Sequence, residues 1–175
     1  MRQLRVLRSL GRSLVLALVV VGGAAAAAPP LPAASGPIVL TVSARPAADA
    51  AAPALAQFDV AMLAALPRHT IVTRTPWYPN PRKFTGVLLR DLLAAVGAGP
   101  SDLRVMALND YRADIPRDDV ESSGVMVAYL LDDEPMRVRD KGPLVIIYPF
   151  DSRSDLRNAV YYSRAVWQLN RLEVK

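Results

Sequence analysis

Residues 70–99 constrain the fold of this chain more than any other segment. The segment begins with β-branched residues typical of a short strand, residues 70–75, and ends with apolar residues at helical spacing, residues 88–96. An aromatic and proline-rich stretch, residues 77–83, separates them, and we predict that it forms a loop. The segment therefore predicts a strand, a loop and an amphipathic helix in succession, within a chain that contains no cysteine.

The remaining sequence predicts further strands and short helices. We expect strands at residues 38–43, 103–108, 111–115, 124–131, 137–139, 144–148 and 165–174. We expect helices at residues 58–66 and from Pro116 onward, and a variable surface connection at residues 45–56. Because strands and helices alternate without the regular spacing of βαβ units, we predict an α+β fold with a mixed sheet and short helices.

The first 28 residues fit a secretory signal peptide. Four arginines precede an apolar stretch at residues 14–21, and small residues follow. No two of these arginines are adjacent, so we expect a general secretory signal, which passes an unfolded chain without a cofactor. We predict a periplasmic or secreted protein. After the signal we expect a disordered leader at residues 29–36 and a single domain at residues 37–175.

The predicted signal peptide also carries most of the net positive charge of the chain, four of the five net charges. The whole chain has a net charge of +5, but removing the four arginines of residues 1–28 leaves 17 basic and 16 acidic residues. This near-neutral balance argues against nucleic acid as a partner. The apolar stretch is shorter than the about 20 residues that span a bilayer, so we expect no membrane anchor after cleavage.

Familiar catalytic and metal-binding patterns are missing from the sequence. His69 is the only histidine, and without cysteine no zinc tetrad can form. The chain has no Gly-x-Ser-x-Gly elbow and no glycine-rich phosphate loop. The acidic clusters at residues 118–119 and 132–134 lack the spacing of an EF-hand.

Three motifs carry a resemblance to a known family. They are the apolar pattern of residues 84–93, Asn109-Asp110-Tyr111, and Gly142-Pro143-Leu144. Together with residues 70–99, they resemble the molybdopterin-binding domain of the sulfite oxidase family over roughly residues 38–174. The resemblance implies a sulfite oxidase-like molybdopterin-binding fold, with molybdopterin as the possible cofactor. In that family a cysteine thiolate near the strand end holds molybdenum, and the matching stretch here is residues 72–75.

The resemblance further implies a groove in which loops converge on the pterin. The matching positions offer aromatic side chains that can cover a flat heterocycle and cations that can hold a phosphate. The candidate residues are Trp77, Tyr78, Arg82, Lys83, Asn109, Tyr111 and Lys141. The alternative reading of this stretch is that Trp77 lies at the edge of the core and that Arg82 and Lys83 are solvated.

The missing thiolate directs the functional prediction. We expect no catalytic residue, no metal and no resident cofactor, and we predict a periplasmic scaffold that binds a small ligand or a protein partner. A cluster of basic and aromatic residues suits a partner, although it also fits a polar loop with core tyrosines: Arg153, Arg157, Tyr161, Tyr162 and Arg164. One alternative is a genuine molybdopterin-dependent oxidoreductase with a non-thiolate ligand at residues 73–75. The other is an accessory module of a membrane sensor or secretion system.

Overall fold

The computed structural model describes residues 31–44 and 54–175. The predicted signal peptide and much of the predicted connection at residues 45–56 lie outside the described residues. Ser35 and Gly36, which end the predicted leader, donate backbone N–H bonds to the buried carboxylate of Asp59, each at 2.7 Å. The same carboxylate accepts the N–H of Met62 and so caps helix α1, and these backbone hydrogen bonds lower the pKa of Asp59.

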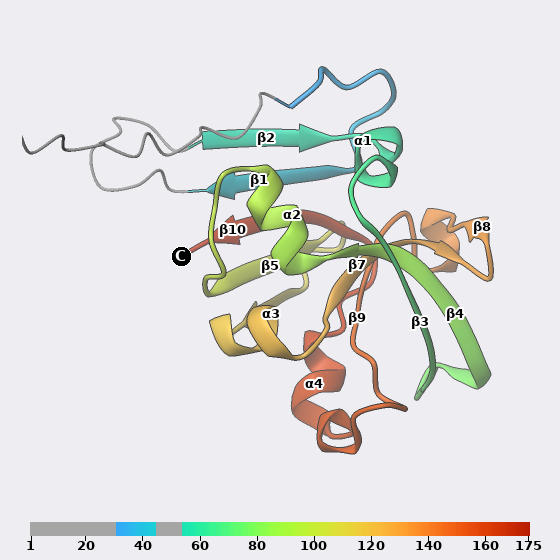
Figure 1. Cartoon of the computed structure of the whole chain (residues 1–175). Coiled ribbons are helices and arrows are strands. Elements are labelled where there is room, and N and C mark those ends of the chain that lie inside the picture. The colour runs from blue at the N-terminus through green and yellow to red at the C-terminus, as the bar shows by residue number, and fades with distance from the viewer. Residues whose placement is uncertain (1–30, 45–53) are drawn as a thin grey trace, which may run out of the picture.

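The first of two sheets joins the two ends of the described chain (Figure 1). Its strands, in spatial order, are β2 (Ala54–Phe58), β1 (Leu40–Ala44), β10 (Leu169–Val174), β5 (Leu103–Ala107) and β6 (Arg112–Ile115). Strands β1 and β10 are parallel, and the other pairs are antiparallel. The last strand therefore lies in the middle of this sheet, between the first strand and the β5–β6 hairpin.

The second sheet is antiparallel and is built around a long hairpin. Its strands are β3 (Arg68–Thr75), β4 (Tyr78–Leu88), β7 (Met126–Leu131) and β8 (Glu134–Pro135), and β9 (Val145–Ile147) also pairs with β7. Gly86 on β4 lies so close to β7 that a Cβ atom would overlap the Val127 carbonyl. A glycine is therefore required at this point of the β4–β7 pair.

Short helices cover the sheets and close the core. The helices are α1 (Val60–Ala64), α2 (Leu89–Ala95), α3 (Arg117–Ser122) and α4 (Ala159–Arg164), with 3₁₀ turns η1 (Val138–Asp140) and η2 (Ser154–Leu156). Helix α2 buries Leu89, Leu92 and Leu93. Leu92 and Leu93 follow Leu89 by three and four residues, so all three lie on one face of the helix. These leucines join apolar residues from both sheets in one buried cluster. Within the described ranges, no helix has the length and apolar character needed to cross a membrane.

A buried polar cluster ties α3, α4 and the end of β9 together. The carboxylate of Asp119 accepts the Tyr148 hydroxyl at 3.0 Å and the Arg164 guanidinium at 2.9 Å. Asp119 is 6% exposed and Tyr148 is fully buried. Burial, with the Asp119 charge beside it, raises the pKa of Tyr148 well above its usual range. The raised pKa favours the protonated phenol, which donates its hydrogen bond to Asp119.

The α+β fold class is confirmed, and most predicted elements appear with small shifts of their ends. Two predictions are wrong. Residues 78–83, predicted as part of a loop, belong to β4, and residues 137–139, predicted as an edge strand, lead into the 3₁₀ turn η1. In addition, residues 54–56 of the predicted surface connection are paired in β2.

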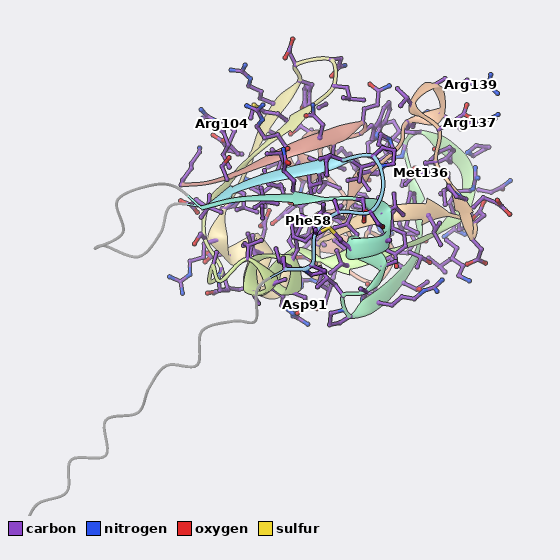
Figure 2. The ribbon with its side chains drawn as sticks, turned by 90° about the horizontal axis from the view of Figure 1, so that it is seen from above. Phe58, Asp91, Arg104, Met136, Arg137 and Arg139 are labelled. Carbon is purple, nitrogen blue, oxygen red and sulfur yellow. The ribbon has the colours of Figure 1, made fainter. Side chains whose placement is uncertain are left out.

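Both errors have a local cause. Pro79 and Pro81 suggested a loop, but at this end β4 pairs only with β3, because its pairing with β7 begins at Phe84. A proline is tolerated in a strand where no neighbour needs its N–H. At the other site, Asp140 donates its N–H to the Arg137 carbonyl and pairs with the Arg137 guanidinium at 2.8 Å, which closes a turn. The side chains of Arg137 and Arg139 project from the molecule there, whereas Phe58 lies inside (Figure 2).

Candidate functional site

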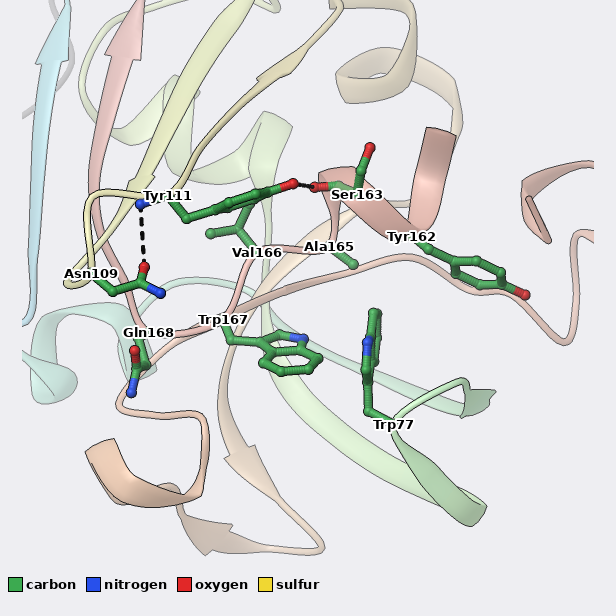
Figure 3. Close-up of a pocket in the computed structure, with 9 residues that line it drawn as sticks. All are labelled: Trp77, Asn109, Tyr111, Tyr162, Ser163, Ala165, Val166, Trp167 and Gln168. Carbon is green, nitrogen blue, oxygen red and sulfur yellow. Dashed lines mark hydrogen bonds between the residues drawn. The ribbon is translucent and has the colours of Figure 1, made fainter. Parts of the chain in front are cut away.

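Three of the seven predicted site residues line one pocket of about 260 Å³ (Figure 3). Trp77 reaches it from the turn between β3 and β4, and Asn109 and Tyr111 reach it from the turn between β5 and β6. The rest of its wall comes from the end of α4 and the segment that follows it: Tyr162, Ser163, Ala165, Val166, Trp167 and Gln168. The pocket therefore lies where turns from both sheets meet.

Hydrogen bonds hold the β5–β6 side of the pocket. The Asn109 side chain accepts the N–H of Tyr111 through Oδ1 at 3.2 Å, and Asp110 between them has a left-handed backbone with φ of 64°. The hydroxyl of Tyr111 donates to the Ser163 carbonyl at 2.9 Å. The ring of Tyr111 is thus fixed above the space in Figure 3, with Val166 and Ala165 at the back.

Two indoles form the opposite wall. The rings of Trp77 and Trp167 meet edge to face, with centroids 4.9 Å apart and planes at 89°. Trp77 also meets the ring of Tyr162 at 6.3 Å. Such contacts are favourable for aromatic rings and fix their orientation. These are the only two tryptophans of the chain, so both lie at this pocket.

Lys141 lies behind this wall. Its ammonium is 4.7 Å from the ring centre of Trp167 and 5.2 Å from that of Tyr78, so it bridges the two rings by cation–π contacts. The backbone carbonyl of Lys141 accepts the N–H of Gln168, which holds the two segments together. Lys141 therefore supports the aromatic wall from outside the pocket.

The predicted cations Arg82 and Lys83 lie away from this pocket. Arg82 stacks over Tyr78 at 4.7 Å and pairs with Asp132, and Lys83 pairs with Asp133 at 2.9 Å. Tyr78 and Arg82 line a second, larger hollow of about 600 Å³ with η1, where burial raises the pKa of Tyr78. The structure therefore separates Tyr78, Arg82 and Lys83 from Trp77, Asn109 and Tyr111, and a carboxylate neutralises each of the two cations.

The strand end at residues 72–75 is tied to the loop after β9. Thr73 is fully buried, and its hydroxyl accepts the N–H of Asp151 at 3.0 Å and donates to the Arg74 carbonyl at 3.2 Å. In return, the N–H of Arg74 donates to the Asp151 carboxylate at 3.0 Å. Arg157 holds the loop by donating to the carbonyls of Phe150 and Asp151 at 2.6 and 2.9 Å. We call this arrangement of Thr73, Arg74, Asp151 and Arg157 the strand-end latch.

Thr75 differs from Thr73 in one respect. Its hydroxyl is buried, and it has no hydrogen-bond partner among the described residues. Thr75 lies beside a pocket of about 270 Å³ that Arg74, Asp151 and Arg157 also line. The two arginines there lie 3.5 and 3.7 Å from the Asp151 carboxylate, so the charges of this pocket are paired.

The predicted basic-aromatic cluster is bound mainly to its own domain. Arg153 pairs with Asp155 at 2.7 Å, and Arg164 pairs with the buried Asp119. Tyr161 and Tyr162 pack against the rings of Tyr148 and Phe150, respectively. These contacts agree with the alternative reading of core tyrosines in a polar segment, and the protein partner stays a prediction.

Sequence reasoning missed Trp167 and Gln168 as pocket residues. Trp167 forms an isolated bridge with Val145, and Gln168 has a left-handed backbone with φ of 52°, so both precede β10 in an irregular segment. The sequence prediction placed both residues in a regular strand, residues 165–174, whose side chains alternate between the two faces of a sheet. It therefore did not assign Trp167 and Gln168 to a pocket. The available signal was the residue type, because aromatic side chains and a few polar groups commonly line small-molecule sites.

A protein-family model matches the larger part of the chain. The chain matches the oxidoreductase molybdopterin binding domain family over residues 56–151, more than half of its length. The matched part runs from β2 to the Asp151 of the strand-end latch. No curated protein matches the chain significantly.

Proposed function

The chain belongs to the oxidoreductase molybdopterin binding domain family, and from this premise we propose that it is an exported scaffold of that family that works without molybdenum and binds a small ligand. The observation that carries the proposal is the strand-end latch. It occupies the position where the resemblance implies the metal-binding cysteine.

The donor atoms at this position do not suit molybdenum. The chain has no cysteine, and the described residues contain no group of three or more histidine, cysteine, aspartate or glutamate side chains that could hold a metal. The Thr73 hydroxyl is buried and already accepts and donates a hydrogen bond. A neutral hydroxyl used in this way is a poor substitute for a thiolate, which carries the charge that binds the metal.

The surrounding charges support the same proposal. A pterin phosphate is a dianion that needs uncompensated cations. Arg74 and Arg157 face the Asp151 carboxylate, and Arg82 and Lys83 face Asp132 and Asp133. A phosphate placed here would compete with carboxylates for each of these four cations.

The aromatic pocket supports a retained binding role. Its walls come from both sheets, and the hydrogen bond of Tyr111 to Ser163 fixes their spacing. A preformed concave site with aromatic walls and a few polar groups is the usual form of a small-molecule site. The signal-like residues 1–28 support export, which would place this site outside the cytoplasm.

The test is elemental analysis for molybdenum, with pterin fluorescence after oxidation, on protein purified from its native periplasm. We expect neither at a stoichiometric level, and mass spectrometry of the same sample is expected to find a chain lacking about its first 28 residues. Stoichiometric metal and pterin would overturn the proposal, and their loss in a Thr73→Val variant would place the metal ligand at the latch. An Asn80→Asp variant, changed on the exposed hairpin, is the control for preparation losses.

A further inference from the structure

We infer that the open edge of strand β3 binds an extended acidic segment of a partner protein, which adds to the second sheet as one more strand. The proposal goes beyond the ligand-binding role above and does not rest on it, because β3 contributes no residue to the aromatic pocket. It rests on three features of residues 68–72: backbone groups without partners, an exposed face, and positive charge without a counter-charge.

The backbone of Val72 points away from the rest of the sheet. Among the described strands, β3 is the last of its sheet and pairs only with β4, where Val72 lies opposite Lys83. Lys83 uses both of its backbone groups on the side of β7: its N–H donates to the Asp132 carboxylate at 2.9 Å, and its carbonyl accepts the Asp132 N–H at 2.7 Å. Val72 therefore holds a non-hydrogen-bonded position in the β3–β4 pair, and its N–H and C=O point to the open edge.

Two more residues of β3 share this orientation. The register of β3 against β4 is regular until a shift near its C-terminal end, so alternation places Arg68 and Thr70 like Val72. The hydroxyls of Thr70 and Thr85 meet at 3.4 Å, as expected for the close side chains of a non-hydrogen-bonded pair. Within the described part of the chain, no hydrogen bond reaches the N–H or C=O groups of Arg68, Thr70 and Val72. Each of these residues thus offers one donor and one acceptor to an added strand.

The strand-end latch limits this open edge to residues 68–72. The N–H of Arg74 donates to the Asp151 carboxylate, and the carbonyl of Arg74 accepts the Thr73 hydroxyl, so an added strand finds no free group there. Proteins protect edge strands from unwanted pairing with prolines, bulges, covering segments or charge. Residues 68–72 contain no proline and no register shift, so charge is the device that selects what pairs here.

The side chains along this edge are exposed and positively charged. Val72 keeps 61% of its surface exposed, and Arg68, His69 and Thr70 are exposed as well. Strand β3 contains two arginines and one histidine, and it contains no acidic residue. Arg68 forms no ion pair with any residue that the structure describes. An acidic strand added here would give Arg68 the counter-charge that it lacks.

A second copy of the chain suits this edge less well. In an antiparallel pair of two β3 strands centred on Thr70, Arg68 of one copy would lie diagonal to Arg74 of the other, and β3 supplies no carboxylate between them. Like charges across a strand pair are destabilising. The edge therefore suits a segment with acidic residues at alternate positions and β-branched residues between them, whose apolar side would extend the buried face that begins at Ile71.

The test is a titration of the purified mature protein into a dye-labelled, end-capped peptide of sequence VEVEVEV, followed by fluorescence anisotropy. As a strand, this peptide presents its glutamates on one face and its valines on the other. We expect saturable binding with a Kd below about 1 mM. The peptide VKVKVKV has the same length and alternation but the opposite charge, and we expect it to bind at least about fivefold more weakly.

Val72→Pro and Val72→Ala separate the backbone edge from the side chain. Both variants shorten or remove the exposed valine side chain, but only proline removes the N–H that an added strand needs. Because this N–H points away from β4, a proline is tolerated at the position. We expect Val72→Ala to bind within about twofold of the wild type and Val72→Pro at least about fivefold more weakly. Thr70→Pro against Thr70→Ala repeats the comparison at the neighbouring outward position and replaces it if Val72→Pro does not fold.

Arg68→Gln tests the contribution of charge. We expect the preference for VEVEVEV over VKVKVKV to fall at least about twofold in this variant. The matched control is Arg112→Gln, which removes the same charge from an exposed position of β6 in the other sheet. Arg112→Gln is expected to keep the preference of the wild type.

Each outcome decides for or against the proposal. Absence of saturable binding, equal binding of the two peptides, or equal binding by Val72→Pro and Val72→Ala would overturn it. A dimer of the protein alone that Val72→Pro abolishes would identify a second copy as the occupant of the edge and would equally overturn it. Amide hydrogen exchange gives the position: slower exchange at Thr70 and Val72 in the presence of VEVEVEV supports the proposal, and unchanged exchange at both contradicts it.

Discussion

Replacing each buried threonine of β3 by valine has opposite expected effects on stability. Thr73 and Thr75 lie two residues apart, are each at most 9% exposed, and would lose the same hydroxyl. Valine has nearly the same shape, so the change isolates the hydroxyl from the packing. The sign of the effect therefore depends only on what each hydroxyl contacts in the folded protein.

The structure sets the size of both effects. The Thr75 hydroxyl has no partner within the described part of the chain, and burying an unpaired hydroxyl costs about 1 to 3 kcal/mol. Thr75→Val is expected to raise the free energy of unfolding by about 1 kcal/mol, since water in the unfolded chain satisfies that hydroxyl. Thr73→Val leaves the N–H of Asp151 without its acceptor and is expected to lower the free energy of unfolding by about 1 to 2 kcal/mol.

Urea unfolding followed by tryptophan fluorescence measures both changes. In thermal unfolding, a change of 1 kcal/mol corresponds to a shift of about 2 to 4 °C for a domain of this size. The reasoning is refuted if Thr75→Val destabilises the protein as much as Thr73→Val does. That result would mean that the Thr75 hydroxyl has a partner in solution, and it would direct attention back to an oxygen ligand at residues 73–75.

Three further predictions concern other parts of the fold. Gly86→Ala is expected to lower the free energy of unfolding by about 2 to 3 kcal/mol, because the added methyl group overlaps the facing strand, and urea unfolding checks this. Asp119→Ala, which leaves a buried phenol and a guanidinium unpaired, is expected to cost about 3 to 5 kcal/mol, whereas Tyr148→Phe costs about 1 kcal/mol in the same assay. Arg104 and Lys175 lower the pKa of Asp114 to about 2. Because this pKa is lowered on folding, its stabilising contribution is present above about pH 4 and is lost as the pH falls through about 2. The difference in unfolding free energy between wild type and Asp114→Asn should therefore disappear in acid, and a difference that grows there would contradict the assignment. Because the Asp114 side chain is half exposed, the expected difference is a few tenths of a kcal/mol, about the value for surface ion pairs.

Much of the fold follows from local patterns that can be read in the sequence. Helix α2 and strands β5, β6 and β7 were predicted because apolar spacing and turn residues agree there. Strand β4 was missed at residues 78–83 because prolines usually end a strand, and whether one is tolerated depends on which neighbour pairs with it. Pairing partners are a property of the whole fold, so local sequence cannot supply them.

The site was harder to predict for a related reason. Trp77, Asn109 and Tyr111 were named as candidates because of the family resemblance, and the structure places them at one pocket. Trp167 and Gln168 complete it from a segment near the other end of the chain, which lies beside them only because β10 is inserted between β1 and β5. Arg82 and Lys83 were grouped with Trp77 by proximity in sequence, but alternation along β4 and pairing with residues 132–133 direct them elsewhere.

The latch and the aromatic pocket are connected through one segment, which makes their separate roles testable in one protein. The loop at residues 149–157 closes the latch at Thr73 and also leads into α4, whose last residues carry Tyr162 and Ser163 to the pocket wall. Ser163 in turn fixes Tyr111 through its carbonyl. A loop that had to accommodate a metal at the strand end would have to open the bond between Asp151 and Thr73, and the movement would pass through α4 to the pocket. The closed latch therefore holds the segment that leads into α4, and with it Tyr162 and Ser163, in the position that forms the wall of the aromatic pocket.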